Sequence, residues 1–203
     1  MAPKIVDKEA KKHEILIAAM SLFAKNGVIQ TKMTDIAQAT GIGKGTIYEY
    51  FRSKEDIFAT AYEMIFNSTI DKVQSILNSS LEPEEKLRQL MSVTVDNFFH
   101  DGGKFAGIMM SFWSEGIRNK DDRIIDIIDL SKVYHEYRHI IAGILTEGIE
   151  KGYFRQMNTF MSASALIGAM DGILLQVILD PNLFSPQQAM ETLLDMYLNG
   201  IKK

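Results

Sequence analysis

The chain has 203 residues, 46% of them hydrophobic and 24% charged, which is typical of a globular protein with a substantial core. It contains no Cys, which excludes disulfides and thiolate metal sites and favours a reducing compartment. The net charge of −4 is uneven: residues 1–60 hold nine Lys or Arg against seven Asp or Glu and the remainder is acidic, so only the N-terminal end is suited to binding a polyanion.

Helical periodicity dominates the first third of the chain, and no stretch alternates as a strand would. An apolar stripe predicts a first helix that ends near Asn26-Gly27, a pair typical of helix C-termini. Short helices are predicted over 34–40 and 44–50. Ser53, followed three residues later by Asp56, is a capping pair that begins a long fourth helix.

The remaining two thirds of the chain also follow a helical pattern. We expect helices over 83–100, around Met109, over 122–151, over 158–179 and over 186–201. The boundary signals are Pro83, Gly152, Asn158 and Ser185. The sequence therefore predicts an all-α fold of about nine helices.

The most apolar stretch covers residues 159–179 and has the length of a membrane span. Asp171 and Gln176 interrupt it, and it is rich in Ser and Gly, which favours a buried helix. The first fourteen residues are charged where a signal peptide requires an apolar core. We therefore expect a cytoplasmic protein with no membrane partner.

Residues 33–52, MTDIAQATGIGKGTIYEYFR, have the spacing of a helix-turn-helix. Ala37 is small where the second helix crosses the first, and Gly41 permits the positive φ angle of the turn. Three isoleucines are spaced to hold the helices together: Ile36, Ile42 and Ile47. Polar side chains on the second helix are then free to face a DNA major groove: Lys44, Thr46, Tyr48, Glu49 and Tyr50. On spacing alone, two short helices that merely meet at a glycine remain an alternative.

This segment resembles the DNA-binding domain of the TetR family of transcriptional regulators. The matching pieces are IL-x-AA-x-x-LF-x-x-x-G from residue 15, IA-x-x-x-G from residue 36, and G-T-I-Y-x-Y-F-x-S-K-E from residue 45. The resemblance implies an all-α homodimer whose first three helices bind DNA. It places a DNA-binding domain over 9–69, with the helix-turn-helix at 32–51, and a divergent domain over 70–203 that dimerises and often holds a small-molecule inducer.

The resemblance also implies roles for individual residues of the head. It places four of them at or near base edges: Lys44, Gly45, Thr46 and Tyr48. Three others are expected to contact phosphates: Thr34, Tyr50 and Lys54. Glu49 departs from the neutral or basic residue that family members often carry. Its carboxylate could accept a hydrogen bond from the amino group of a cytosine or be repelled by a phosphate, and the sequence leaves both roles open.

The last two predicted helices have features of an interface between two chains. Helix 158–179 carries small residues at close-packing spacing, and helix 186–201 has a broad apolar stripe. The residues expected at a homodimer interface are Ala165, Gly168, Gly172, Leu194, Tyr197 and Leu198. The alternative is packing within one chain.

The middle helices are rich in methionine and aromatic residues, and twelve Met is a high number for this length. Flexible thioethers suit a cavity for varied apolar ligands. The residues expected to line an inducer pocket are Met109, Phe112, Trp113, Tyr134, Tyr137, Met161 and Met170. Ordinary core packing is the alternative for each of them.

The stretch HEYRH at 135–139 matches H-E-x-x-H, the zinc-binding motif of metalloproteases. The extended form of the motif requires Gly at 142 and His at 145, where this chain has Ala142 and Leu145. No Glu lies between Glu150 and Glu191 to serve as a third ligand on a following helix. We therefore interpret HEYRH as coincidental and expect no metal, no cofactor and no enzymatic activity.

The leading hypothesis is a homodimeric transcriptional repressor that binds a pseudo-palindromic DNA operator and is released by a small apolar or amphipathic inducer. A second hypothesis is a DNA-binding regulator or chromosome-organising protein whose body binds a protein partner and no small ligand. A third, an enzyme with an appended DNA-reading domain, requires a convergent catalytic constellation, and beyond HEYRH the sequence contains none.

Overall fold

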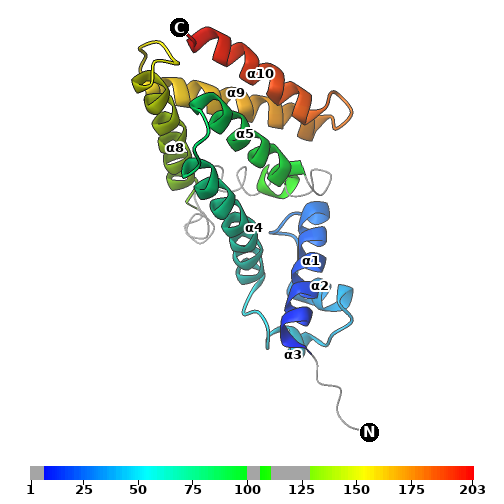
Figure 1. Ribbon diagram of the computed structural model, residues 1–203. Helices are drawn as coiled ribbons and strands as arrows, with labels where there is room; N and C mark the ends of the chain where they lie inside the picture. Colours follow the sequence, from blue (N-terminus) through cyan, green and yellow to red (C-terminus); the bar gives the residue numbers. More distant parts are fainter. Residues whose placement is uncertain (1–6, 100–105, 111–128) are drawn as a thin grey trace. The chain divides into compact units, whose positions relative to one another are not determined.

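A computed structural model describes residues 7–99, 106–110 and 129–203 (Figure 1). These residues form helices and their connections, with one isolated β-bridge between Phe154 and Lys202. The all-α fold is therefore confirmed. The chain divides into two compact units: one comprises Met1–Phe66 and Gly107–Ile128, and the other comprises Asn67–Ala106 and Asp129–Lys203.

The first unit contains α1 (Lys8–Asn26), α2 (Met33–Ala39), α3 (Lys44–Ile47) and the first part of α4 (Lys54–Leu77). Helix α1 ends where predicted, because Gly27 has a φ of 77° and donates its N–H to the carbonyl oxygen of Phe23. The rings of Phe23 and Phe58 meet edge to face at 6.1 Å. The buried side chains of this unit include Ile15, Ala19, Phe23, Ile36, Ile47, Phe51, Ile57 and Phe58.

The second unit contains the rest of α4 together with α5 (Pro83–Phe99), α8 (Leu130–Glu150), α9 (Thr159–Leu179) and α10 (Pro186–Ile201). Helix α8 packs against α5 and α9, and α10 packs against the same two helices (Figure 1). Their inward faces form one continuous apolar core that includes Leu87, Leu90, Ile141, Leu145, Leu166, Met170, Leu194 and Leu198.

Most helices of the second unit begin where their capping residues predicted that they would begin. The side chain of Asn158 accepts the N–H of Met161 at 3.0 Å, and Ser185 precedes Pro186 at the start of α10. The predicted start of α8 at residue 122 is wrong. Asp129 is a cap rather than a helical residue, since its side chain accepts the N–H of Lys132 at 2.9 Å, and α8 begins at Leu130.

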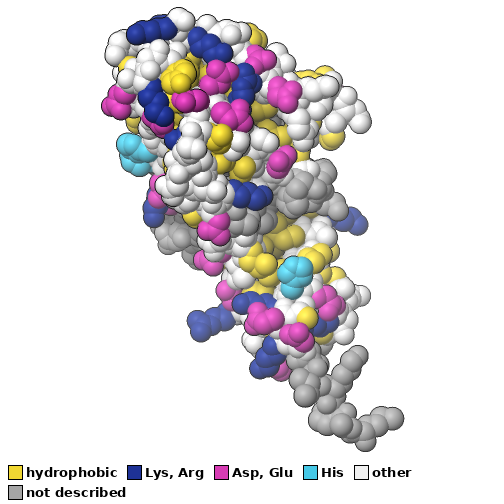
Figure 2. All heavy atoms as spheres, viewed as in Figure 1, with side chains coloured by type: hydrophobic (Ala, Val, Ile, Leu, Met, Phe, Trp, Pro, Cys, Tyr) yellow, Lys and Arg dark blue, Asp and Glu magenta, His cyan; other side chains and the backbone are white. Residues whose placement is uncertain are grey.

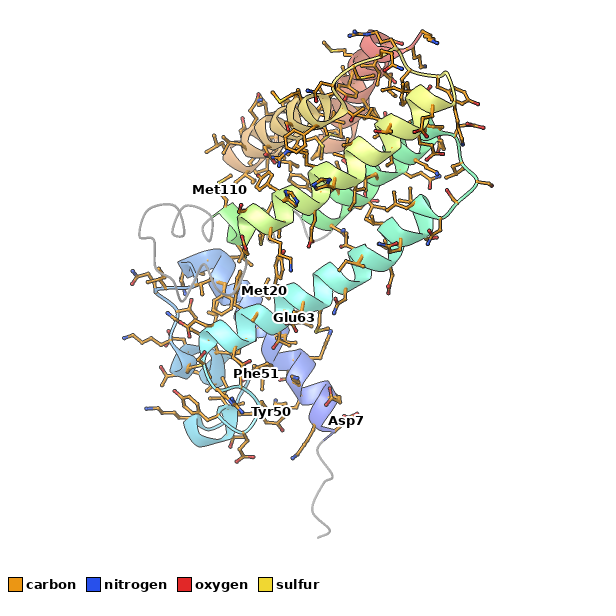
Figure 3. The ribbon with its side chains drawn as sticks, turned by 90° about the vertical axis from the view of Figure 1, so that its left-hand side faces the viewer. Asp7, Met20, Tyr50, Phe51, Glu63 and Met110 are labelled. Atoms are coloured by element: carbon orange, nitrogen blue, oxygen red, sulfur yellow. The ribbon has the colours of Figure 1, made fainter. Side chains whose placement is uncertain are left out.

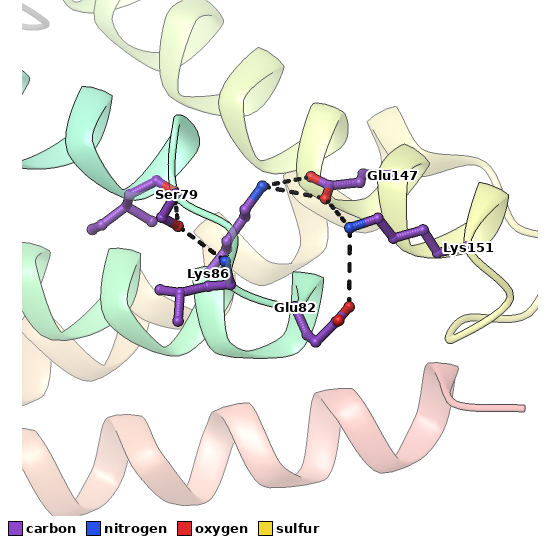
Figure 4. A network of polar contacts seen from close by, with 7 residues as sticks. Ser79, Glu82, Lys86, Glu147 and Lys151 are labelled. Atoms are coloured by element: carbon purple, nitrogen blue, oxygen red, sulfur yellow. Dashed lines mark hydrogen bonds and ion pairs between the residues drawn. The ribbon is translucent and has the colours of Figure 1, made fainter.

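An ion-pair network connects α5 to α8 (Figure 4). Lys86 is only 5% exposed, and its amino group lies 2.9 Å from Glu147. Lys151 lies 2.8 Å from the same carboxylate and 4.0 Å from Glu82. The hydrogen bonds from Lys151 and Lys86 hold the pKa of Glu147 below its ordinary value. Charged side chains of both signs mingle over the visible surface of this unit (Figure 2).

Helix α9 is long and apolar enough, by length and composition alone, to cross a membrane. Its buried side chains nevertheless belong to the core of the second unit: Ala163, Leu166, Ile167, Met170, Leu174 and Val177. A helix packed on one side against two others, here α8 and α10, is the arrangement of a core helix in a globular domain. Its other side is also apolar, with Leu175 and Leu179 exposed.

Candidate nucleic-acid interface

The turn between α2 and α3 is shaped by Gly41, which has a φ of 64°. Residues with a Cβ rarely adopt this conformation, so a glycine is required here. The N–H of Ile42 donates to the carbonyl oxygen of Ala37 at 3.0 Å, and the hydroxyl of buried Thr40 donates to that of Ile36 at 2.9 Å. These bonds satisfy the last carbonyls of α2 and fix the direction in which α3 leaves the turn.

The predicted contacts between the two helices are present in part. Ile36, Ala37 and Ile47 are buried, whereas Ile42 is only half-buried. Helix α3 ends at Ile47, three residues earlier than predicted, and residues 48–50 form a turn. Phe51 after this turn is buried and Tyr50 is half-buried (Figure 3). The segment 44–51 is therefore anchored by one face and leaves its polar side chains outside.

Most residues predicted to contact DNA lie together on the surface of the first unit. Thr34, Lys44, Gly45, Tyr48 and Glu49 are exposed, and Tyr48 is a large aromatic side chain at 48% exposure. Thr46 and Tyr50 are half-buried. The structure thus brings six of the seven predicted residues to α2, α3 and the turn that follows α3.

The seventh residue, Lys54, has a partner within the chain. Its amino group donates a hydrogen bond to the carbonyl oxygen of Ile29, in the connection between α1 and α2. This bond ties the start of α4 to that connection. No local sequence pattern predicts this bond, because Ile29 lies 25 residues away and the bond uses a backbone atom. A phosphate contact by Lys54 stays a prediction. It would require the ammonium group to bind the phosphate together with the carbonyl oxygen of Ile29, or to exchange one for the other.

Gly45 lies in α3, yet none of the described residues requires a glycine there. Its φ is not in the positive region, and a Cβ added to it would meet no atom within 4 Å. Gly costs about 1 kcal/mol relative to Ala inside a helix. The fold therefore gains nothing from the missing side chain at this exposed position.

The residues predicted for a ligand pocket are in different environments. Met170 and Met109 are buried, while Met161 is 61% exposed and faces away from the core of its own unit. Phe112 and Trp113 lie outside the described residues. The structure thus supports an interior position for Met109 and Met170 but not for Met161.

Two tyrosines of the predicted pocket make hydrogen bonds between helices. The hydroxyl of Tyr137 lies 2.8 Å from that of Thr94 on α5, and the hydroxyl of Tyr134 donates to Asp171 on α9 at 2.9 Å. Burial raises the pKa of both tyrosines, and it raises that of Asp171 as well. Neither pair was predictable from a local pattern, since the partners of Tyr134 and Tyr137 lie 37 and 43 positions away.

A groove of about 240 Å³ lies elsewhere in the second unit, between α5 and α10. Apolar Met91, Val95 and Met190 line it together with Arg88, which lies 2.7 Å from Asp195. Leu194, which was predicted at the dimer interface, also lines this groove. Neither Tyr134 nor Tyr137 lines this groove, so the groove is separate from the pocket predicted around them.

The residues predicted for a dimer interface divide between the surface and the core. Ala165 and Gly168 are exposed, and Gly172 and Tyr197 are partly so. Leu194 and Leu198, at 2% and 0% exposure, are enclosed within the chain itself. A side chain buried in one chain cannot contact a second chain directly, so these two leucines belong to the core rather than to an interface.

The histidines of HEYRH lie on the outer side of α8. His135 and His139 are both exposed, and their ring centroids are 4.3 Å apart. Within the described part of the chain, no group of three or more His, Asp or Glu side chains is placed to hold a metal ion. A zinc site with three protein ligands is therefore not formed around this pair by the described residues.

The chain is similar in sequence to known bacterial regulators. The model for bacterial regulatory proteins of the tetR family matches residues 15–61. The chain is 22% identical over 195 residues to the fatty acid metabolism regulator protein of Bacillus subtilis, covering 96% of this chain and 97% of that protein. It is 29% identical over 156 residues to the HTH-type transcriptional repressor KstR2 of Mycolicibacterium smegmatis, covering 76% of this chain and 73% of that one.

A similar fold is known from the fatty acid degradation regulator FadR of Bacillus halodurans. That structure aligns with a TM-score of 0.77 and 26% identity, covering 94% of this chain and 95% of the other. The family match covers the helix-turn-helix described above, and the similarity of the relatives extends through the second unit. The chain is therefore a transcriptional regulator of the TetR family.

Proposed function

We propose that the protein is a cytoplasmic, homodimeric repressor that binds a pseudo-palindromic DNA operator through α2 and α3 and is released by a lipid-like inducer. The observation that carries the DNA contact is Gly45. An exposed helical glycine with open space around it is explained if an external backbone approaches closely at that point. Neighbouring Lys44 and Tyr48 are exposed beside it and suit a polyanion with readable base edges.

Replacement of Gly45 by Ala tests the DNA contact without disturbing the fold. The operator is first selected from random duplex DNA with the wild-type protein. Gly45→Ala is then expected to weaken operator binding roughly tenfold, because one close contact is worth about 1–3 kcal/mol. Thermal unfolding should be unchanged or slightly raised. Gly143→Ala on α8, another exposed glycine with open space, is the matched control and should leave affinity unchanged. Equal affinity of both variants would contradict the placement of DNA against Gly45.

The role of Lys54 is separable from that of Lys44 by salt dependence. If Lys54 contacts phosphate, Lys54→Ala should reduce the slope of log affinity against log salt by about one unit. If it only holds Ile29, the variant should lose thermal stability and retain the wild-type slope. Lys44→Ala, at an exposed position, provides the reference for losing one cation from the interface.

The second chain is expected on the exposed side of α9. Gly168 is exposed in the middle of this helix, and a Cβ there would meet no atom within 4 Å. Exposed apolar side chains lie at helical spacing from it on α9: Met161, Leu175 and Leu179. Met196 on α10 is exposed as well. An exposed apolar helix face with a glycine at its middle suits the close approach of an identical helix. One short recognition helix reads few bases, so a dimer also supplies the second half-site.

A charge at Gly168 tests this assembly. Gly168→Glu is expected to give monomers in sedimentation velocity and to abolish operator binding, because the carboxylate would be buried between chains. Gly143→Glu, on the exposed side of α8, should remain dimeric. A Gly168→Glu protein that stays dimeric at micromolar concentration would refute the use of this face.

The class of inducer is proposed from the relatives and from the second unit. Two of the three relatives are regulators of fatty acid metabolism or degradation, and one is a repressor. In this chain, buried Met170 offers apolar surface, and two hydroxyl groups offer polar groups: that of Tyr134, bonded to Asp171, and that of Tyr137, bonded to Thr94. Such a combination suits an amphipathic ligand. We therefore propose a fatty acid or a closely related apolar acid as inducer.

Fatty acids of graded chain length provide the test of induction. Binding is followed by the fluorescence of Trp113, the single tryptophan, and operator affinity is titrated with and without each acid. A 100-fold loss of operator affinity corresponds to about 2.7 kcal/mol of coupling, within the usual range for allostery. Helix α4 contributes residues to both units and is a covalent route for this coupling. An acid that binds and leaves operator affinity unchanged would contradict induction while leaving the DNA contact intact.

A further inference from the structure

The exposed face of α8 carries a pair of histidines that DNA binding and induction do not use. We propose that His135 and His139 form a two-histidine chelate for a divalent first-row transition metal ion. The two residues are four apart in one helix, so their side chains leave the helix on the same face. Both are exposed, and Figure 2 shows histidine side chains at the surface of the second unit.

The separation of the two rings fits coordination of one metal ion by both. A metal ion held by imidazole nitrogens at about 2.0 Å lies about 3.2 Å from each ring centre. The ring centres are then about 4.5 Å apart for a nitrogen–metal–nitrogen angle of about 90°, and about 5.2 Å apart for a tetrahedral angle. The observed centroid separation is 4.3 Å. This separation is therefore compatible with a two-histidine chelate, and the usual order of affinities for nitrogen ligands favours Cu²⁺ over Ni²⁺ and Zn²⁺.

The neighbouring side chains hold this arrangement. The ring of His139 lies edge-on to that of Phe160 on α9, at 6.5 Å. The guanidinium of Arg138 lies over the same Phe160 ring at 5.1 Å, which places this cation toward α9. On the solvent side, Glu136 lies 3.9 Å from Lys132. Lys132 and Glu136 thus pair with each other, and Arg138 is engaged with Phe160.

The proposed site differs from the catalytic zinc site of metalloproteases, whose H-E-x-x-H motif HEYRH matches. In the described part of the chain no third His, Asp or Glu joins the pair, so water or a small ligand completes the coordination. Chelation would fix one turn of α8 that also carries Tyr134 and Tyr137, which bond to α9 and α5. Bound metal is therefore expected to stabilise the packing of α8 in the second unit.

The test uses the full chain without an affinity tag. Cu²⁺, Ni²⁺ and Zn²⁺ are titrated by calorimetry, and the Cu²⁺ complex is examined by electron paramagnetic resonance. We expect one strongly bound Cu²⁺ per chain, two nitrogen ligands in the spectrum, and affinity in the order Cu²⁺, Ni²⁺, Zn²⁺. His135→Ala and His139→Ala should each weaken Cu²⁺ binding about tenfold or more, because the second imidazole acts at high effective concentration.

His13→Ala, which removes an exposed histidine on α1, is the matched control and should leave Cu²⁺ binding unchanged. Circular dichroism confirms that each exposed substitution leaves the helices intact. Cu²⁺ binding that survives the double variant His135→Ala/His139→Ala would overturn the proposal. So would a loss of binding in His13→Ala alone, or a spectrum with a single nitrogen ligand. None of these outcomes bears on operator binding, which is measured separately.

Discussion

Replacement of Gly148 by Ala should destabilise the second unit, because a buried ring occupies the space of the new Cβ. A Cβ built on Gly148 would lie 2.1 Å from Cδ2 and 2.2 Å from Cε2 of Phe154. Ordinary contacts begin at 3.4 Å, so the ring or the helix must shift by about 1.3 Å, the difference between 3.4 and 2.1. A close-packed interior does not absorb such a shift without cost.

The ring has little freedom to move away. Phe154 is 1% exposed and belongs to the core of the second unit. Its own N–H and that of Tyr153 both donate to the carbonyl oxygen of Gly148, at 3.1 and 2.9 Å. The N–H of the next residue, Arg155, donates to Ile201 at the end of α10 at 2.8 Å. The turn is therefore held to α8 on one side and to α10 on the other.

Overpacking costs about 1–3 kcal/mol, and the gain from replacing a helical glycine by Ala offsets about 0.5–1 kcal/mol of it. We expect a net loss of about 1–2 kcal/mol, which lowers the melting temperature by about 2–4 °C per kcal/mol. Gly143→Ala on the same helix has open space around it and should instead gain about 0.5–1 kcal/mol. The difference between the two variants isolates the contact with Phe154.

The assay is urea unfolding followed by circular dichroism at one fixed protein concentration, because association also changes apparent stability. The double variant Gly148→Ala/Phe154→Leu should lose less than the sum of the two single variants, since leucine lacks the ring atom Cε2. If Gly148→Ala proved as stable as Gly143→Ala, Phe154 would not be the reason for the glycine.

Three further predictions use the same unfolding assay. Glu147→Gln should cost about 1–3 kcal/mol at neutral pH, since it leaves the buried amino group of Lys86 without a carboxylate, and Lys86→Met in the same chain should recover most of the loss. Because the pKa of Glu147 is lowered in the folded state, its contribution is present above the ordinary carboxyl pKa, and the difference from wild type should vanish as pH falls through the depressed value. Asp171→Asn should be more stable than wild type at pH 7 by about 1 kcal/mol or less, since burial raises the pKa of Asp171 and wild type loses stability as pH rises through that value. The gain should disappear in acid, and a constant gain from pH 3 to 8 would contradict a burial effect. Asn158→Ala should cost about 1 kcal/mol through loss of the α9 cap, and an unchanged midpoint would show that the cap is dispensable.

The features that could be predicted from the sequence are those that depend on short stretches of chain. Gly27, Asn158 and Ser185 mark helix ends because a positive φ angle or a capping oxygen acts on backbone groups within a few residues. The helix-turn-helix was predictable for the same reason, since Gly41 and the buried Ile36 and Ile47 all act within one local supersecondary unit. The start of α8 was not predicted, because the sequence around Asp129 does not show that its side chain accepts the N–H of Lys132 and caps the helix.

The face that each helix turns toward the core depends on how the helices pack against one another. Helix α9 is apolar on nearly all sides, so periodicity could not choose between its core face and a face for another chain. Met161 on this helix was expected in a pocket and is exposed. On α10, the apolar stripe did not show whether it faces the core or a second chain, and Leu194 and Leu198, expected at an interface, lie in the core. Contacts such as Lys86 with Glu147 join residues 61 positions apart, and pairs at such separation are set by the packing of whole helices rather than by any local pattern.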